Sequence, residues 1–165
     1  RWMELNAFSV IFRTHEGVVP DANHQCYSDE ETLAHFSRCA RIYAAWAPYR
    51  KQLVQQAIDT GLPVVRHPFL HYPHDPKVRT MNYEQFMVGD AFMVAPVLEP
   101  GKHQAQCHLP EGDWLHLWSG EEYAVDKNGL NVTVEAPLGN PAVFCRPGTE
   151  ATTIFLNNLK KLGIH

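Results

Sequence analysis

The sequence predicts an α/β part that is followed by an all-β part within a chain of 165 residues. Up to about residue 80, two short apolar runs flank a long stretch with helical spacing. After residue 90 the helical spacing disappears, and turn-forming glycines recur at short, even intervals. We therefore expect two kinds of architecture in one chain, with a boundary between about residues 76 and 90.

The first part is built around one long predicted helix. Ser28 is followed three residues later by Glu31, a capping box that typically marks a helix N-terminus. Pro48 lacks a backbone N–H, so a kink or a new helix start is expected there. Gly61 followed by Pro63 indicates the C-terminus. Apolar positions at spacings of four, three and four residues predict one buried face: Phe36, Ala40, Tyr43 and Ala47.

Two strands are expected on either side of this helix, at residues 8–15 (FSVIFRTH) and 64–72 (VVRHPFLHY). A strand, a crossover helix and a second strand form a βαβ unit, in which the two strands run parallel. Parallel sheets are covered on both faces. Such a unit cannot stand alone, so the pattern favours a part of a larger fold.

The second part reads as a β-sandwich. Short apolar runs with strand character alternate with turn residues, and the last of these runs is TTIFL at 152–156. Asn128-Gly129 is a typical hairpin turn. The glycines that separate the runs lie 8 to 11 residues apart: Gly101, Gly112, Gly120, Gly129, Gly139 and Gly148. We expect domains at residues 1–80 and 90–165.

Composition excludes some classes of function. Hydrophobic residues make up 45% and charged residues 19%, as in a packed globular domain. The net charge of −4 and the absence of a basic run argue against nucleic-acid binding. No apolar run is long enough to cross a membrane, and no leader pattern opens the segment. The four cysteines form no C-x-x-C pair, so we expect free thiols and a cytoplasmic location.

The first candidate site residues are Arg13 and His15, at the end of the predicted strand 8–15. The carboxyl ends of strands in α/β folds carry ligand sites. Residues two apart on a strand point to the same side, so these two side chains would act together. Arg13 could orient a carboxylate, neutralise a substrate or form a structural ion pair, and His15 could be a histidine satisfied under a loop. Glu16 could act as an acid or base, but nothing local pairs with it.

Two other patterns favour structure over function. His67, His71 and His74 are spaced too widely along an extended segment for easy convergence on one metal ion, so no metal site is expected. Trp114 and Trp118 could stack on sugars, but Trp114, His116 and Trp118 alternate as the core face of a strand does. Neither a G-x-S-x-G nor a phosphate-binding glycine motif is present.

The order of several blocks along the chain resembles glycoside hydrolase family 31, the α-glucosidase and α-xylosidase family. The blocks together cover nearly the whole sequence: RWMELNAFSVIFRTHEG, GLPVVRHPFLHYPHD, FMVGDAFMVAPVLEPGK, LPEGDWLHLWSGEEY and VEAPLGNPAVFCRPGT. The Arg-Thr-His-Glu-Gly form, together with His-Leu-Trp-Ser-Gly, looks closest to the sulfoquinovosidase branch.

This resemblance implies the C-terminal end of a (β/α)8 barrel, residues 1–80, followed by a C-terminal β-sandwich domain, residues 90–165. It implies a retaining α-glycoside hydrolase that cleaves terminal α-linked sugars, here sulfoquinovosides, without metal or organic cofactor. His15 matches a histidine that hydrogen-bonds a sugar hydroxyl, and Arg13 matches a supporting arginine beneath the site. Both catalytic aspartates of the family lie before the segment that matches Arg1-Trp2, so this chain contains no catalytic residue.

Three alternatives remain open on the sequence. The first is an ordinary α-glucosidase or α-xylosidase of the same family. The second is a carbohydrate-binding fragment that uses Trp114 and Trp118. The third is a non-catalytic homologue. The sequence does not fix the oligomeric state.

Overall fold

The computed structural model describes residues 1–165 and contains helices and antiparallel strands. The α-helices are α1 (Trp2–Ala7), α2 (Glu30–Ala45), α3 (Ala47–Thr60), α4 (Pro76–Thr80) and α5 (Glu150–Lys161), and the short 3-10 helices are η1 (Pro20–Ala22) and η2 (Pro68–Leu70). The strands are β1 (Val65–Arg66), β2 (Phe86–Val88), β3 (Phe92–Ala95), β4 (Gln104–Leu109), β5 (Gly112–His116), β6 (Glu122–Val125), β7 (Leu130–Glu135) and β8 (Ala142–Cys145).

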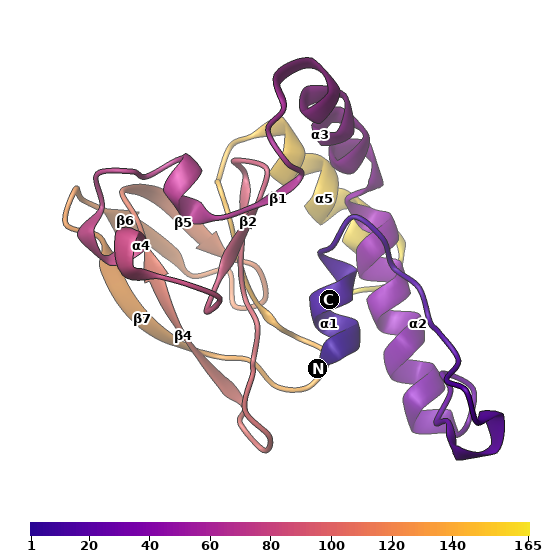
Figure 1. Ribbon diagram of the computed structural model, residues 1–165. Coiled ribbons are helices and arrows are strands. Elements are labelled where there is room, and N and C mark those ends of the chain that lie inside the picture. The colour runs from indigo at the N-terminus through magenta and orange to yellow at the C-terminus, as the bar shows by residue number, and fades with distance from the viewer.

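These elements form three layers (Figure 1). The middle layer is a six-stranded sheet in the order β1-β2-β3-β8-β5-β6, and every neighbouring pair in it is antiparallel. The second sheet contains only β4 and β7. Helices α1, α2, α3 and α5 lie on the opposite side of the six-stranded sheet.

Alternation along the central strands creates two separate cores. On β3, Phe92 and Val94 face the helices, whereas Met93 and Ala95 face the two-stranded sheet. Strand β8 divides its residues in the same way. All side chains of both strands are buried, because each strand has a packed layer on both faces. The six-stranded sheet is therefore covered on both faces, by the helices on one side and by β4 and β7 on the other.

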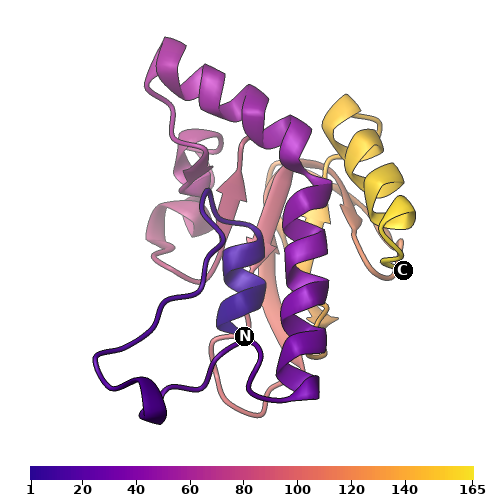
Figure 2. The ribbon, with the colours of Figure 1, turned by 90° about the vertical axis from the view of Figure 1, so that its right-hand side faces the viewer.

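Helices α2 and α3 follow each other directly and are separated by a single break. Helix α2 ends at Ala45 and α3 begins at Ala47, with Pro48 in its first turn, which confirms the predicted interruption. Helix α3 ends at Gly61 in the left-handed conformation (φ 78°), also as predicted. The amide of Asn158 on α5 donates to the carbonyl of Ala45 over 2.9 Å and so satisfies a backbone acceptor exposed by the break. Figure 2 shows α5 beside this junction.

The predicted βαβ unit is wrong. Residues 8–15 form no strand, since α1 occupies Trp2–Ala7 and the chain then runs as a loop to η1. The predicted strand 64–72 is limited to Val65–Arg66 before η2 begins. Strand β1 pairs antiparallel with β2, so no parallel pair exists in this chain. In the apolar run that suggested a strand, Phe12 packs instead against α2, and Phe8 meets Phe155 of α5.

Three further expectations need correction. The run TTIFL lies in α5, where Thr152, Phe155 and Leu159 are the buried positions at helical spacing. Asn128-Gly129 forms a turn but no hairpin, because β6 and β7 belong to different sheets. The cap of α2 is the next residue after Ser28: Asp29 accepts from Thr32 N over 2.7 Å.

Candidate functional site

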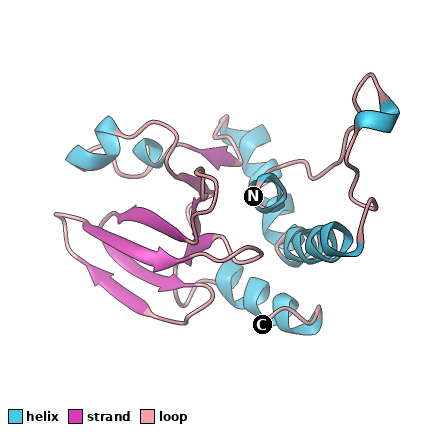
Figure 3. Ribbon diagram, turned by 90° about the horizontal axis from the view of Figure 1, so that it is seen from below, coloured by secondary structure: helices cyan, strands magenta, loops and turns pink.

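A hollow of about 550 Å³ lies between α1, the loop that follows it and the start of α2. The loop leads the chain away from the layers before it returns to α2, as seen from below in Figure 3. Both candidate residues, Arg13 and His15, line this hollow. Its other lining residues are Trp2, Met3, Asn6, Ile11, Phe12, Thr14, His24, Gln25, Cys26 and Phe36.

Helix α1 forms one wall of the hollow and is anchored on its other side. Trp2, Met3 and Asn6 line the hollow, and the Trp2 side chain is largely exposed. Glu4 is buried, and its carboxylate accepts from the backbone N–H of Gly139 over 2.6 Å. The position of this wall therefore depends on the loop between β7 and β8.

Contacts with α2 and with Trp46, the residue between α2 and α3, hold the chain between α1 and the candidate residues. The indole N–H of Trp46 donates to the carbonyl of Ala7 over 2.8 Å. The hydroxyl of Tyr43 donates to the carbonyl of Val10, also over 2.8 Å. The ring of Phe12 stacks against Tyr43 with centroids 5.4 Å apart. The backbone is fixed up to the residue before Arg13.

The side chains of Arg13 and His15 are exposed and make no hydrogen bond or ion pair within this chain. Arg13 therefore forms no internal ion pair, and His15 is not held by a partner under the loop. The hollow contains no carboxylate among its lining residues. The site can donate hydrogen bonds and carry positive charge, but it lacks the paired carboxyl groups that cleave a glycosidic bond.

The sequence interpretation missed His24, Gln25 and Cys26, which return from η1 to the same hollow. The His24 ring lies 3.0 Å from both the Asp29 carboxylate and the Thr32 hydroxyl, so the start of α2 holds it. No local pattern marks these residues, because the loop brings them near His15 only in three dimensions.

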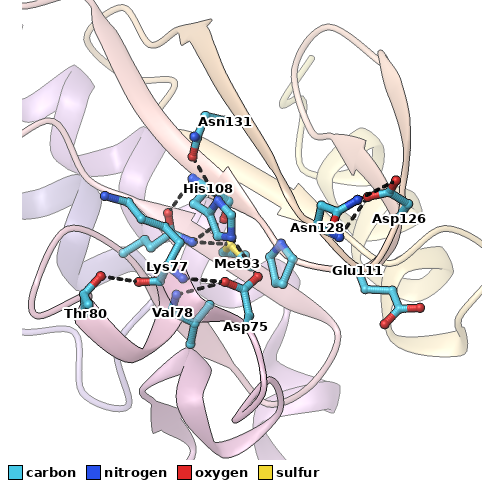
Figure 4. A network of polar contacts seen from close by, with 12 residues as sticks. Asp75, Lys77, Val78, Thr80, Met93, His108, Glu111, Asp126, Asn128 and Asn131 are labelled. Carbon is cyan, nitrogen blue, oxygen red and sulfur yellow. Dashed lines mark hydrogen bonds and ion pairs between the residues drawn. The ribbon is translucent and has the colours of Figure 1, made fainter.

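A second polar cluster lies between α4 and the two-stranded sheet (Figure 4). The Nε2 of His108 lies 2.8 Å from Asp75 Oδ2, and its Nδ1 lies 2.9 Å from Asn131 Oδ1. Asp75 also accepts from the backbone N–H groups of Lys77 and Val78 and so caps α4. Because both ring nitrogens of His108 are engaged, the cluster joins α4 to β4 and β7 and offers no free base.

The charge of Asp75 is stabilised in this cluster. Burial alone raises the pKa of the Asp75 carboxyl, but the hydrogen bonds from His108 and from the backbone of α4 outweigh burial and hold the pKa below its usual range. Gly129 lies against His108 and Asp75 and adopts a positive φ of 71°. A Cβ there would lie 2.5 Å from His108 Cε1, so the predicted turn glycine also leaves room for the pair.

The three histidines of the segment HPFLHYPH do not converge. His67 uses both ring nitrogens, one with the carbonyl of Met81 and one with the backbone N–H of Phe69. His71 lies beside Arg66, and burial lowers the pKa of His71, with the Arg66 charge acting in the same direction. Nowhere do three or more His, Cys, Asp or Glu side chains form a group that could hold a metal ion.

The tryptophans of the second part belong to the packing, as the alternation predicted for Trp114. Its side chain is fully buried, and its indole N–H donates to the carbonyl of Pro110 over 2.8 Å. Trp118 is half-buried, donates to the carbonyl of Pro141 and lies under Arg38. A sugar cannot stack on Trp114, so the structure contradicts a binding module that uses both residues.

Comparison with known proteins places this arrangement in a family. The model of the glycosyl hydrolase family 31 C-terminal domain matches residues 61–149, more than half of the chain. The chain belongs to glycosyl hydrolase family 31. The predicted resemblance is therefore confirmed, and the family 31 match covers the segment from the end of α3 to the start of α5.

Similar proteins from the family include several named sulfoquinovosidases. The chain is 44% identical over 164 residues to a sulfoquinovosidase of Agrobacterium fabrum, and 41% identical over 155 residues to one of Escherichia coli. The solved structure of a family 31 sulfoquinovosidase from E. rectale, in complex with the aza-sugar inhibitor IFGSQ, aligns with a TM-score of 0.89 at 39% identity. This alignment covers 97% of the present chain and 23% of the chain from E. rectale.

The matches extend over almost the whole chain but over a minor part of each relative. The alignments cover 99% and 94% of this chain, and 24% and 22% of the curated relatives from A. fabrum and E. coli. No helix of the structure combines the length and the apolar character that a membrane crossing requires.

Proposed function

We propose that this chain is the C-terminal part of a retaining α-glycoside hydrolase that acts on sulfoquinovosides. The observation that supports this most is the 44% identity to a sulfoquinovosidase across 99% of the chain. Residues 1–80 would complete a (β/α)8 barrel together with preceding segments, and residues 90–165 would form the sandwich domain behind it. The complete enzyme would act in the cytoplasm.

In this proposal the chemistry is divided between two parts of the protein. Two aspartates from the preceding part would act as nucleophile and as acid/base, as the retaining mechanism requires. His15 would donate a hydrogen bond to a sugar hydroxyl, and Arg13 would support the site from beneath. The exposed, unpaired state of both side chains in a hollow without carboxylates supports this division. Such orientation lowers the activation barrier, because the sugar loses its freedom of motion on binding rather than in the chemical step.

The test uses the complete protein that contains this chain. We expect hydrolysis of an aryl α-sulfoquinovoside with a kcat/KM far above that for the matching α-glucoside or α-xyloside. A preference for the glucoside or xyloside would replace the proposed substrate by that of an ordinary family member. No hydrolysis of any of the three would favour a non-catalytic homologue.

A substitution tests the assigned residue in the same enzyme. His15→Ala should lower kcat/KM by about 100-fold or more, because a donor positioned at the reacting sugar is lost. Glu16→Ala serves as the matched control, since Glu16 is exposed on the same loop but does not line the hollow. A kcat/KM that is unchanged in His15→Ala would remove His15 from the site.

A further inference from the structure

The loop that carries Arg13 and His15 contains no regular secondary structure between Phe8 and η1. A catalytic or binding side chain must be held close to its productive geometry, and loops do this less well than helices or strands. Contacts from outside the loop must therefore supply the rigidity. Helix α2 is the element that provides them.

Tyr43 makes two of these contacts with one side chain. Its hydroxyl donates to the carbonyl of Val10 over 2.8 Å, and its ring stacks on Phe12 at an interplanar angle of 27°. Val10 and Phe12 are the last anchored positions before Arg13. Phe36 lies about two helical turns before Tyr43 on α2 and also stacks on the Phe12 ring, with centroids 5.2 Å apart.

Tyr43 is itself held in place. The guanidinium of Arg50 lies 3.7 Å from the centre of the Tyr43 ring and donates to the Tyr43 carbonyl over 2.9 Å. The ring also meets Trp46 edge-on, at 6.0 Å between centroids. Because its surroundings define the ring position, the hydroxyl is a fixed donor rather than a mobile one.

We propose that Tyr43 is a positioning residue that sets the place of the Arg13–His15 segment through Val10 and Phe12. The role of Tyr43 in catalysis rests on the proposed function, whereas its effect on the loop does not. The substitution Tyr43→Phe keeps the ring and removes only the hydrogen bond to Val10. Tyr49→Phe is the matched control, because the Tyr49 hydroxyl bonds to Asp90 and Ala91 in the turn between β2 and β3 and makes no hydrogen bond to the loop.

The first arm of the test measures the loop in the 165-residue chain by ¹⁵N relaxation. Tyr43→Phe should lower the backbone order parameters of residues 10–15, and Tyr49→Phe should leave them unchanged. Unchanged order parameters in Tyr43→Phe would overturn the proposal. A drop of equal size in the Tyr49→Phe control would also overturn it, since the effect would then be general loosening.

The second arm measures kcat/KM for the sulfoquinovoside in the complete enzyme. Tyr43→Phe should lower kcat/KM by about 5- to 10-fold, the equivalent of one lost neutral hydrogen bond. The effect should disappear in a His15→Ala background, because Tyr43 acts through that segment. A purely structural residue would give additive losses, which would overturn the role. If His15→Ala alone has no effect, the proposed function fails together with the role of Tyr43 in catalysis, whatever the relaxation data show.

Discussion

The Asp75–His108 pair joins residues that are 33 positions apart, and both side chains are nearly buried (7% and 5% exposed). A buried carboxylate is stable only when hydrogen bonds replace its water, and Asp75 has three such donors: the ring of His108 and the N–H groups of Lys77 and Val78. By contrast, the ring of His15 is exposed and has no hydrogen-bond partner in this chain.

The pKa of Asp75 leads to a prediction about acid. Since the folded-state pKa lies below the unfolded value of about 3.9, the stabilisation is complete above about pH 5 and is lost as pH falls through the folded value. Asp75→Asn should lower the free energy of unfolding by roughly 1–3 kcal/mol at neutral pH, with a smaller difference from the unsubstituted chain in acid.

Urea unfolding at about pH 7 and about pH 3 measures both quantities. Asp126→Asn is the control, because Asp126 also accepts from a backbone N–H, that of Asn128, but is exposed. A difference between Asp75→Asn and the unsubstituted chain that stays the same at the two pH values would contradict the assigned pKa shift.

Helix α5 shows how one element joins the two parts of the chain. It follows the last strand, yet it packs on α2 and α3 rather than on the sandwich side. Phe155 is fully buried, meets Phe8 edge-on at 6.2 Å and lies 5.0 Å from the ring of Phe92. One side chain thus contacts the end of α1 and the middle of the sheet.

We expect Phe155→Ala to lower the free energy of unfolding by about 3–5 kcal/mol, because a large cavity would open at the meeting point of three elements. The control is Ile58→Ala on α3, whose side chain is 72% exposed and should contribute under about 1 kcal/mol. Chemical denaturation of both variants gives the comparison. Equal losses would mean that α5 does not carry the helical core.

At the scale of the whole molecule, Glu4 holds the helical layer to the β layers. Its carboxylate pairs with Arg1 at 2.9 Å and accepts from the N–H of Gly139, which lies between β7 and β8. Arg38 on α2 binds the same loop through the carbonyl of Gly139 over 2.9 Å. The Glu4 side chain is 2% exposed, so Arg1 and the Gly139 N–H replace the water that the carboxylate loses on burial.

Removal of this carboxylate should therefore affect both layers. Glu4→Ala leaves the Gly139 N–H buried without an acceptor, and we expect a loss of about 2–4 kcal/mol in the free energy of unfolding. Glu99→Ala is the control, since Glu99 forms an exposed pair with Lys102 at 3.8 Å that contributes little. A Glu4→Ala variant as stable as Glu99→Ala would show that the layers hold together without this contact.

The sequence by itself determined the features that depend on near neighbours. The break at Pro48, the end of α3 at Gly61 and the turn glycines follow from backbone conformations that few residues can adopt. The burial of Trp114 follows from alternation on one strand. The order of the five blocks along the chain was enough to identify the family, whose model then matched residues 61–149.

Only the tertiary structure decided what depends on contacts between distant residues. The run at 8–15 has the composition of a strand. In the structure Phe12 stacks on Tyr43 and Phe36 of α2, and the backbone of the run is a loop. Over its short length, TTIFL fits both the two-residue period of a strand and the 3.6-residue period of a helix. The packing of Phe155 against Phe8 and Phe92 favours the helix. His24 reaches the hollow of His15, and His108 reaches Asp75, by chain paths that no local pattern encodes.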